Sequence, residues 1–367
     1  MMHTFATLLA FALLATARPV LDARAASCTG TISSLSDVAA AVKCTTITIN
    51  SFTVDAGKTL ELDLLDGTTV NMAGDVVFGV SNWAGPLLQI DGDDITFNGN
   101  GHTFDGQGPS YWDGQGGNGG VTKPAPMITI NMSGTYSNVK VLNSPARVYS
   151  VHNGAPLVMS GLTIDDSLGD QPNSASGSSA AGHNTDGFDV GSHDLTIKDS
   201  TIMNQDDCLA INKGSNILFT GNTCSGGHGI SIGSISSDAT VSGVVITNNK
   251  IVNNDQALRI KTKADATDAS VTNVTYSGNT ATGTKKYGVI IDQSYPSTLG
   301  TPGNGVALSD VNFVGTENNI AVASGAQRVA VNCGSSSCSG TWDWSALSVT
   351  GGTAGTINYK GITGFSQ

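Results

Sequence analysis

A short strand pattern recurs along the chain at a nearly constant interval, and this repeat constrains the fold more than any other feature. In its clearest form the pattern ends at Val190, Ile211, Ile232, Ile260 and Ile291, at steps of 21, 21, 28 and 31 residues. A second set of similar strands, each soon followed by Asn, Asp, Ser or Gly, comprises residues 95–97, 139–141, 162–164, 195–197, 217–219, 244–246 and 274–276. The repeating unit is a coil of about 22 residues with loops of variable length.

Short alternating strands without helix-length apolar periodicity between them predict an all-β chain. Stacked coils of this kind form a parallel β-helix, in which inward Val, Ile, Leu and Phe build one apolar column and outward residues are polar. Doubly wound α/β folds and α/β barrels are excluded by the missing helices, and a β-propeller would need blades of about 40 residues. With 46 Gly and only 13% charged residues, the composition is that of an ordered, turn-rich protein.

Residues 27–367 are predicted to form a single domain. The open end of a β-helix exposes strand edges, which need a cap. Segment 36–43 has Ser36 at a helix N-cap position followed by helix-forming residues, and we expect this short helix to cap the N-terminal end of the column.

The N-terminal residues have the pattern of a secretory signal peptide. Residues 5–15 are apolar apart from Thr7, and Ala15-Thr16-Ala17 matches a cleavage site. We predict a signal peptide at 1–17, a pro-segment at 18–26 and a secreted, extracellular protein. The apolar run is shorter than the roughly 20 residues of a membrane span, so no membrane association is expected. A buried N-terminal helix is the alternative.

The cysteines fit an oxidising compartment, because an even number in a secreted chain indicates disulfides. They fall into three close couples, which favours the pairs Cys28 with Cys44, Cys208 with Cys224 and Cys333 with Cys338. None of them has the spacing of a zinc site. Two sequons, at Asn131 and Asn273, are candidate glycosylation sites.

The net charge of −12 and the lack of any Lys or Arg run make nucleic acid an improbable partner, because phosphate binding needs a basic stripe. Net charge does not decide what a single cleft binds. Polyanions other than nucleic acid therefore depend on how a few cations are placed.

One group of polar residues follows the repeat. Asp186, Asp207 and His228 are each 21 residues apart, so consecutive coils stack them at roughly 4.8 Å. Strict alternation would point them into the core, and we therefore expect them in the turn before each strand. Asp206 precedes Asp207, and the cations Arg259 and Lys261 share one face of a later strand. Stacked Asp residues are often only turn formers, but carboxylates this close repel one another, so a column of them beside two cations and a histidine indicates function.

Paired carboxylates suit glycosidic cleavage, in which one protonates the leaving oxygen and another activates water or attacks the sugar. Cations opposite them would bind a sugar that carries its own carboxylate. The pattern therefore favours hydrolysis of a uronic-acid polymer.

At these residues the sequence resembles the endopolygalacturonases of glycoside hydrolase family 28. The matching blocks, in the family's order, are Asn184-Thr185-Asp186-Gly187-Phe188-Asp189, Gln205-Asp206-Asp207-Cys208, Gly227-His228-Gly229 and Arg259-Ile260-Lys261. Four blocks together are highly specific. The resemblance implies a right-handed parallel β-helix that hydrolyses α-1,4-galacturonosyl bonds with inversion and without a metal or other cofactor.

The resemblance also implies a role for each matching residue. Asp206 would be the general acid, with His228 supporting its protonation, and Asp186 and Asp207 would orient and deprotonate the water. Arg259 and Lys261 would bind the substrate carboxylate, and Asn184 and Tyr295 match residues of the substrate cleft. Stacking near 4.8 Å would suggest retention under the usual carboxylate-separation rule, to which the family is an exception.

These features predict a monomeric endopolygalacturonase acting on de-esterified homogalacturonan. Three alternatives remain on the same architecture. An exo-acting enzyme would block one end of the cleft with a long insertion, and none beyond about 20 residues is present. A lyase would use Ca²⁺ held by the three aspartates, leaving His228 without a role. A non-catalytic protein would bind pectate without turnover.

Overall fold

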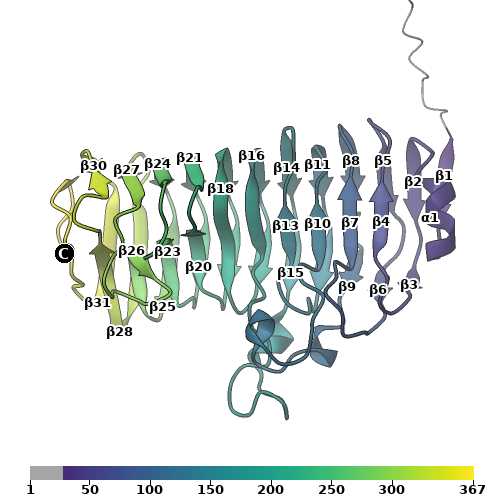
Figure 1. Ribbon diagram of the computed structural model, residues 1–367, viewed down its shortest axis with the longest axis horizontal. Coiled ribbons are helices and arrows are strands. Elements are labelled where there is room, and N and C mark those ends of the chain that lie inside the picture. The colour runs from purple at the N-terminus through teal and green to yellow at the C-terminus, as the bar shows by residue number, and fades with distance from the viewer. Residues whose placement is uncertain (1–27) are drawn as a thin grey trace, which may run out of the picture.

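The computed structural model describes residues 28–367 and confirms the parallel β-helix. The predicted signal peptide (1–17) and pro-segment (18–26) lie outside the described residues. The chain winds into a rod of stacked coils, with β1 (Thr29–Ile32) at one end and the C-terminus at the other (Figure 1). Thirty strands join in one continuous sheet, and neighbouring coils pair in parallel register.

Each full coil contributes three strands, which stack into three columns. The first column contains β4 (Leu60–Asp63), β7 (Leu88–Asp91), β10 (Ile128–Ile130), β13 (Tyr149–Val151), the first halves of β16 (Phe188–Lys198) and β18 (Asp207–Thr220), β20 (Gly229–Ile235), β23 (Gln256–Lys263), β26 (Tyr287–Tyr295) and the end of β28 (Asn318–Asn332). The second column contains β1, β2 (Thr46–Ile49), β5 (Thr69–Met72), β8 (Ile95–Asn98), β11 (Gly134–Ser137), β14 (Leu157–Ser160), the second halves of β16 and β18, β21 (Thr240–Thr247), β24 (Ala269–Ser277), β27 (Val306–Phe313) and β29 (Cys338–Ser339).

The third column contains β3 (Phe52–Val54), β6 (Val76–Phe78), β9 (Thr103–Asp105), β12 (Lys140–Leu142), β15 (Thr163–Asp165), β17 (Thr201–Met203), β19 (Thr223–Ser225), β22 (Lys250–Val252), β25 (Thr280–Thr284), the start of β28 and β31 (Leu347–Thr353). A separate pair, β30 (Trp342–Asp343) and β32 (Ile362–Thr363), lies near the C-terminus. Short 3₁₀ turns η1 (Gly108–Ser110), η2 (Gly116–Asn118) and η3 (Ser167–Asp170) lie in loops between strands.

The strand pattern that ends at Val190, Ile211, Ile232, Ile260 and Ile291 is confirmed as part of the first column. The second predicted set is wrong in two members, because residues 139–141 and 162–164 belong to the third column. Their places beside β8 are taken by β11 and β14. All three columns have the same alternation of apolar residues. Sorting the strands into two sets by this pattern therefore places strands of the third column in the second set.

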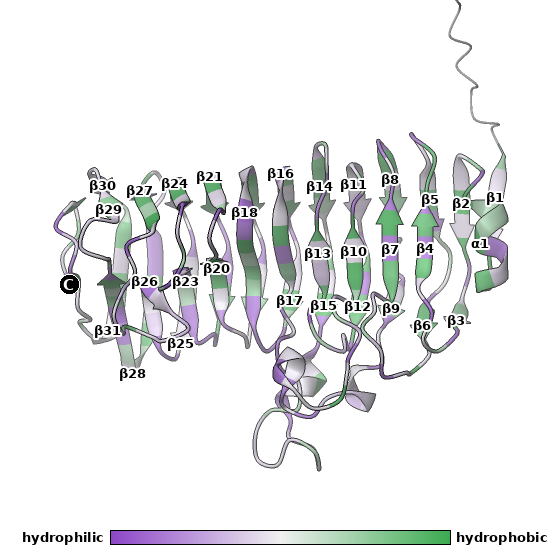
Figure 2. Cartoon of the chain, viewed as in Figure 1, coloured by the Kyte–Doolittle hydropathy of each residue, from purple (hydrophilic) through white to green (hydrophobic). Residues whose placement is uncertain are grey.

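The interior of the rod is apolar along the described chain. Inward residues such as Ile90, Phe97 and Phe219 are fully buried, and Figure 2 shows the hydrophobic bands that alternate with polar ones along the strands. Ring contacts continue from coil to coil, as between Tyr149 and Phe188, whose ring centroids lie 5.3 Å apart. Burial of this surface stabilises the fold at roughly 25 cal/mol per Å².

The predicted capping helix is present as α1 (Leu35–Ala41), beside β1 at the end of the rod. It begins earlier than expected, because Ser34, not Ser36, occupies the N-cap position. The Ser34 hydroxyl donates to Asp37 at 2.9 Å, and the Ser33 amide donates to the same carboxylate at 3.0 Å. Asp37, in the first turn of the helix, thus provides an acceptor for the backbone amide of Ser33, which precedes the helix.

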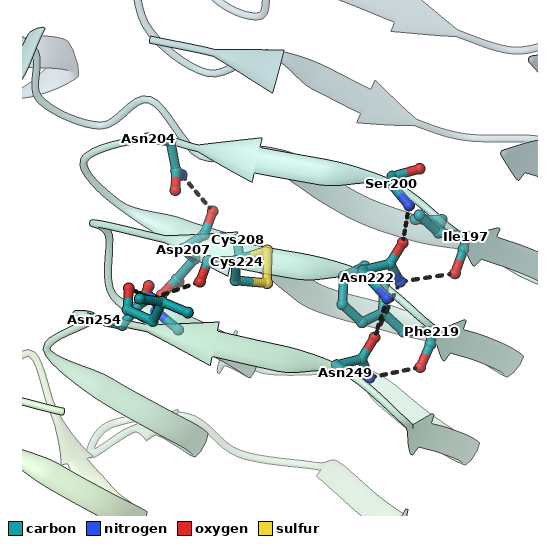
Figure 3. Close-up of a disulfide and its surroundings, with 12 residues drawn as sticks. Ile197, Ser200, Asn204, Asp207, Cys208, Phe219, Asn222, Cys224, Asn249 and Asn254 are labelled. Carbon is teal, nitrogen blue, oxygen red and sulfur yellow. Dashed lines mark hydrogen bonds between the residues drawn. A yellow bond between two sulfur atoms is a disulfide. The ribbon is translucent and has the colours of Figure 1, made fainter. Parts of the chain in front are cut away.

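All three predicted disulfides are confirmed. They join Cys28 with Cys44, Cys208 with Cys224 and Cys333 with Cys338. The bond between Cys208 and Cys224 ties the start of β18, in the first column, to β19 in the third column (Figure 3).

A ladder of buried asparagines continues through the turns beyond the Cys208–Cys224 disulfide. Asn222 donates to Asn249, Asn249 to Asn279 and Asn279 to Asn318, at 3.2, 3.0 and 2.8 Å. Figure 3 shows Asn222 and Asn249 of this ladder. Each of these side chains also donates to a backbone carbonyl, such as that of Phe219. The ladder satisfies buried polar groups that the strand pairing leaves open.

The two sequons differ in accessibility. Asn273 is exposed, whereas the Asn131 amide donates to Asp91 at 2.7 Å and is half-buried. Glycosylation stays a prediction, and Asn273 is the better placed of the two. Within residues 28–367, no helix has the length and apolar character that a membrane crossing needs.

Removing one member of the asparagine ladder should destabilise the protein. We expect Asn249→Ala to lower the free energy of unfolding by about 1–3 kcal/mol, because it leaves the buried Asn222 backbone amide without the Asn249 Oδ1 that accepts its hydrogen bond. Chemical denaturation measures the change. Asn319→Ala is the control, since Asn319 is exposed beside the last ladder residue; equal effects of both variants would contradict this role for the ladder.

Candidate active site

The predicted site residues come together where three consecutive coils enter the first column. Asp186 lies just before β16 and His228 just before β20, as expected for turn positions, whereas Asp207 is the first residue of β18. The Gly187 amide donates to the Asp207 carbonyl at 2.8 Å, and the His228 amide donates to the Asp206 carbonyl at 2.7 Å. A register shift after Asp207 places His228 against Asp206 instead of directly over Asp207.

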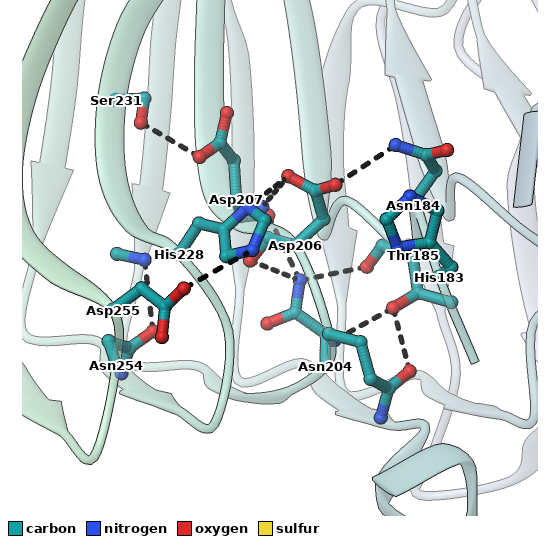
Figure 4. A network of polar contacts seen from close by, with 12 residues as sticks. His183, Asn184, Thr185, Asn204, Asp206, Asp207, His228, Ser231, Asn254 and Asp255 are labelled. Atoms are coloured by element: carbon teal, nitrogen blue, oxygen red, sulfur yellow. Dashed lines mark hydrogen bonds and ion pairs between the residues drawn. The ribbon is translucent and has the colours of Figure 1, made fainter. Parts of the chain in front are cut away.

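Asp206 is surrounded by donors (Figure 4). Its Oδ1 accepts from His228 Nδ1 and from the Asp207 amide, both at 2.8 Å, and its Oδ2 accepts from Asn184 Nδ2 at 3.0 Å. Burial alone would raise the pKa of Asp206, but the hydrogen bond and charge of His228, the charge of Lys261 and the Asp207 amide hold it below its ordinary value. In the substrate-free protein Asp206 is therefore the ionised partner.

His228 is the protonated partner of this pair. Burial lowers the pKa of His228, but the hydrogen bond and charge of Asp206, followed by the charge of Asp207, outweigh that effect, and the pKa is raised. Its Nε2 lies 3.8 Å from Asp255, which forms an ion pair with Lys286 at 2.7 Å. The imidazole is thus held between two carboxylates.

Asp207 is fully buried, and both of its oxygens are occupied. Oδ1 accepts from Ser231 at 2.9 Å and from the Arg259 guanidinium, and Oδ2 accepts from Lys261 at 2.7 Å. The two predicted substrate-binding cations therefore point at Asp207, one of the predicted catalytic carboxylates. Lys261 also lines the cleft, 5.3 Å from the centroid of the Tyr295 ring.

Asp186 completes the group and faces the cleft. Burial and the negative charges of Asp206, Asp189 and Asp207 raise the pKa of Asp186 well above its usual value, and Lys261 offsets part of this. Asp186 consequently binds a proton more tightly than an ordinary aspartate does. The cluster therefore favours a proton on Asp186 and on His228 over one on Asp206.

The cleft has a volume of about 420 Å³ and contains the predicted residues Asn184 and Tyr295. Asn184 adopts a left-handed backbone at φ 50°, which Asn tolerates, and its side-chain oxygen accepts from the Gly117 amide at 3.1 Å. Gly117 belongs to a loop that an ion pair of 2.9 Å between Lys123 and Asp113 holds together. That loop forms one wall of the cleft.

Two further hollows adjoin this cleft. One, of about 590 Å³, shares Arg147, Asp189, Asn212 and Ser234 with it. The other, of about 450 Å³, lies on the side of His228 and is also lined by Asp255. The first hollow is thus continuous with the cleft, and the second lies on the other side of Asp206.

The sequence of this chain is similar to that of known proteins. A family model described as glycosyl hydrolases family 28 matches residues 44–365. The chain is 42% identical to endopolygalacturonase I of Aspergillus aculeatus, over 90% of this chain and 86% of that protein. It is 43% identical to endopolygalacturonase 1 of Colletotrichum lindemuthianum, over 94% and 93%. The chain belongs to glycosyl hydrolases family 28.

The fold agrees with a solved structure of the same kind of protein. Endopolygalacturonase I from Stereum purpureum, complexed with two galacturonate molecules, superimposes with a TM-score of 0.87 at 50% identity. The match covers 91% of this chain and 98% of that one. This family 28 chain is therefore similar to endopolygalacturonases over nearly its whole described length.

The sequence predicted no role for three residues of this family 28 site. Asn204 is buried and donates to the carbonyls of Thr185, Asp206 and Asp207 at 2.8, 3.1 and 3.0 Å, which joins the coil of Asp186 to the next one (Figure 4). Ser231 bridges Arg259 and Asp207.

Asp189 is the third of these residues. It lines the groove beside Arg147, and its pKa is about 6 because burial and nearby carboxylates outweigh the cation. Ser231 could have been found from the sequence, because aligning the repeated strands places it opposite Arg259. Nothing in the strand pattern marks Asn204.

The link between Asp206 and His228 can be measured directly. We expect Asp206→Asn to lower the pKa of His228, because the carboxylate that raises it becomes neutral. In the wild type the imidazolium persists above pH 6.5, and the stability that the ion pair contributes is present below about that pH and lost as the pH rises through the raised value. Imidazole NMR titration measures the shift, with the exposed His193 as internal reference; an unchanged pKa of His228 would refute the coupling.

Proposed function

We propose that this chain is a secreted endopolygalacturonase that hydrolyses internal α-1,4-galacturonosyl bonds of de-esterified homogalacturonan. The observation that carries the proposal is the cluster of Asp186, Asp206 and Asp207, joined to His228 and Lys261 in one polar groove. The relatives named above are endopolygalacturonases, and the Stereum purpureum structure contains galacturonate. Carboxylates for acid and base chemistry and a cation for a uronate are thus in one place.

In this mechanism Asp206 is the general acid, and Asp186 with Asp207 directs the attacking water. The protons in the empty cleft are distributed differently, since Asp186 is protonated and Asp206 is ionised. Groups this strongly coupled titrate as a unit, so one proton can move within the cluster. A substrate carboxylate placed at Lys261 would offset the positive charge that lowers the pKa of Asp206, and displaced water would raise that pKa further.

The cations divide their work in this scheme. Arg259 contacts Asp207 and Ser231, so it acts as a positioning residue that orients the Asp207 carboxylate. Lys261 lies on the cleft wall beside Tyr295, where its ammonium can bind a substrate carboxylate and Asp207 at the same time. Asn184 donates to Asp206 and orients the acid. The roles of Lys261, Asn184 and Tyr295 toward substrate remain part of this proposal.

We propose an inverting reaction because of the family resemblance. Side-chain oxygen and nitrogen atoms of Asp206, Asp207 and His228 lie within 4.8 Å of one another. This is shorter than the about 6.5–9.5 Å usual for inverting pairs. Asp186, on the neighbouring coil, provides the additional carboxylate that the simple two-residue rule does not consider.

The groove favours an endo mode. The cleft continues past Asp189 on one side, and a second polar hollow lies beyond His228 on the other, so a polymer has room to extend in both directions. An exo-acting relative would need one of these ends closed.

The donors around the carboxylates argue against a Ca²⁺-dependent lyase. Asp206, Asp207 and His228 form the one group of metal-ligating residues close enough for an ion within the described chain. Both oxygens of Asp206 accept hydrogen bonds, and both oxygens of Asp207 face cations. Calcium needs six to eight oxygen ligands, which this arrangement does not offer. The residues present do not fit a calcium site.

Secretion and solution state complete the proposal. Three disulfides are typical of extracellular proteins and agree with the predicted signal peptide. We propose that the protein acts as a monomer, and that nucleic acid is no partner because of the net charge of −12.

The first activity test is digestion of polygalacturonate by the purified protein in the presence of a chelator. We expect a rapid loss of viscosity with few new reducing ends, no unsaturated product, and the inverted anomer in early proton NMR spectra. New ends without a loss of viscosity would indicate an exo mode. Unsaturated product, or binding without turnover, would refute hydrolysis.

The general acid can be identified by the leaving group. We expect Asp206→Asn to lower kcat on polygalacturonate by at least about 100-fold. On a dinitrophenyl oligogalacturonide the same variant should keep much of its activity, because that leaving group needs no proton. Kinetics on both substrates provide the measurement.

Asp186→Asn is the matched variant for this test. We expect it to be inactive on both substrates, because a water-activating group is needed whatever the leaving group. The opposite pattern, with Asp186→Asn rescued and Asp206→Asn not, would exchange the two roles, in line with the protonated Asp186 of the empty cleft.

A further inference from the structure

The hollow of about 590 Å³ beside the catalytic cleft contains charged groups that the mechanism above does not use. It is lined by Lys213 and His152, together with Asn212, Ser237 and Asp238. Arg147 and Asp189 lie where it joins the cleft, and they pair with each other at 3.5 Å. The hollow is therefore an extension of the site with its own polar lining.

A β-bulge directs Lys213 into this hollow. Val190 pairs with Ile211, but the next pair is Gly191 with Lys213, so Asn212 is an extra residue in β18. Without the bulge, Lys213 would stand two positions after the buried Ile211 and point into the core. With it, Ile211 is buried and Lys213 is exposed. Bulges commonly redirect a side chain beside an active site in this way.

The Lys213 side chain crosses the backbone at a glycine. A Cβ at Gly191 would lie 3.3 Å from Lys213 Cε and 3.3 Å from His152 Nδ1, so the missing side chain leaves room for both. Burial, with the nearby charge of Lys213, lowers the pKa of His152, which keeps the imidazole neutral. Among residues 28–367, Lys213 takes part in no ion pair. Lys213 is thus a charged ammonium whose position in the groove is built by the bulge and by Gly191.

We propose that Lys213 binds the carboxylate of a galacturonate unit that lies several units away from the bond that is cleaved. The inference rests on the proposed function. Lys213 lies six positions after Asp207 in β18, which is roughly 20 Å along an extended strand. Only a longer oligosaccharide reaches both positions. Lys213 is in this way a specificity residue for chain length and for de-esterified units, because an esterified carboxyl offers no charge.

The test compares substrates of different length. We expect Lys213→Ala to raise KM for hexagalacturonate about two- to fivefold, the size of one exposed ion pair, with kcat unchanged. Lys213→Glu should raise it further, and Lys213→Arg should restore it. For trigalacturonate spanning the cleavage site, all three variants should match the wild type. Lys250→Ala is the control, because Lys250 is an exposed strand lysine of the third column.

Equal KM changes for trimer and hexamer, no change at all, or the same change in Lys250→Ala would overturn the proposal. A failure of the proposed function would look different, since the wild type itself would not hydrolyse polygalacturonate. In that event, calorimetric titration with hexagalacturonate decides the question for Lys213. Weaker binding by Lys213→Ala supports the inference, and equal binding overturns it.

Discussion

In-register stacking of parallel coils is the constraint on which the rest of this structure depends. It places residues of the same position in neighbouring coils at the strand spacing of roughly 4.8 Å. For inward Val, Ile, Leu and Phe this spacing is favourable, and the interior becomes one continuous apolar column. Buried polar residues at this spacing need hydrogen-bond partners or opposite charges to offset their desolvation and repulsion. In the turns, asparagines donate to one another, and at the site, Lys261 contacts Asp207.

The carboxylates proposed to be catalytic show how that compensation sets the properties of a site. Asp207 has no exposure and would be strongly destabilising without Arg259 and Lys261 on its two oxygens. Asp206 is held ionised by His228, and Asp186, which has no such partner, keeps a proton. Asp186 and Asp206 therefore differ in their affinity for a proton because their neighbours differ. A cluster of this kind responds strongly to one more carboxylate, such as that of a substrate.

Much of this arrangement could be predicted from the sequence. The steps of 21 residues identified the first column and brought Asp186, Asp207 and His228 together, and the spacing of the cysteines identified all three disulfides. Two strands were assigned to the wrong column because the alternation of apolar residues is the same on every face. The N-cap of α1 lies two residues earlier than predicted, at Ser34, where Asp37 accepts from the Ser33 amide and the Ser34 hydroxyl.

The sequence by itself determined the class of fold and the chemical types of the site, because periodicity and residue identity are properties of the chain alone. Tertiary structure decided which atoms face each other. The register shift after Asp207 sets His228 on Asp206, and both cations turn toward Asp207. A second irregularity, at Asn212, brings Lys213 out of the core and into the groove. Bulges depend on how one strand fits its neighbour in space, and a one-residue slip reverses the face of every side chain that follows.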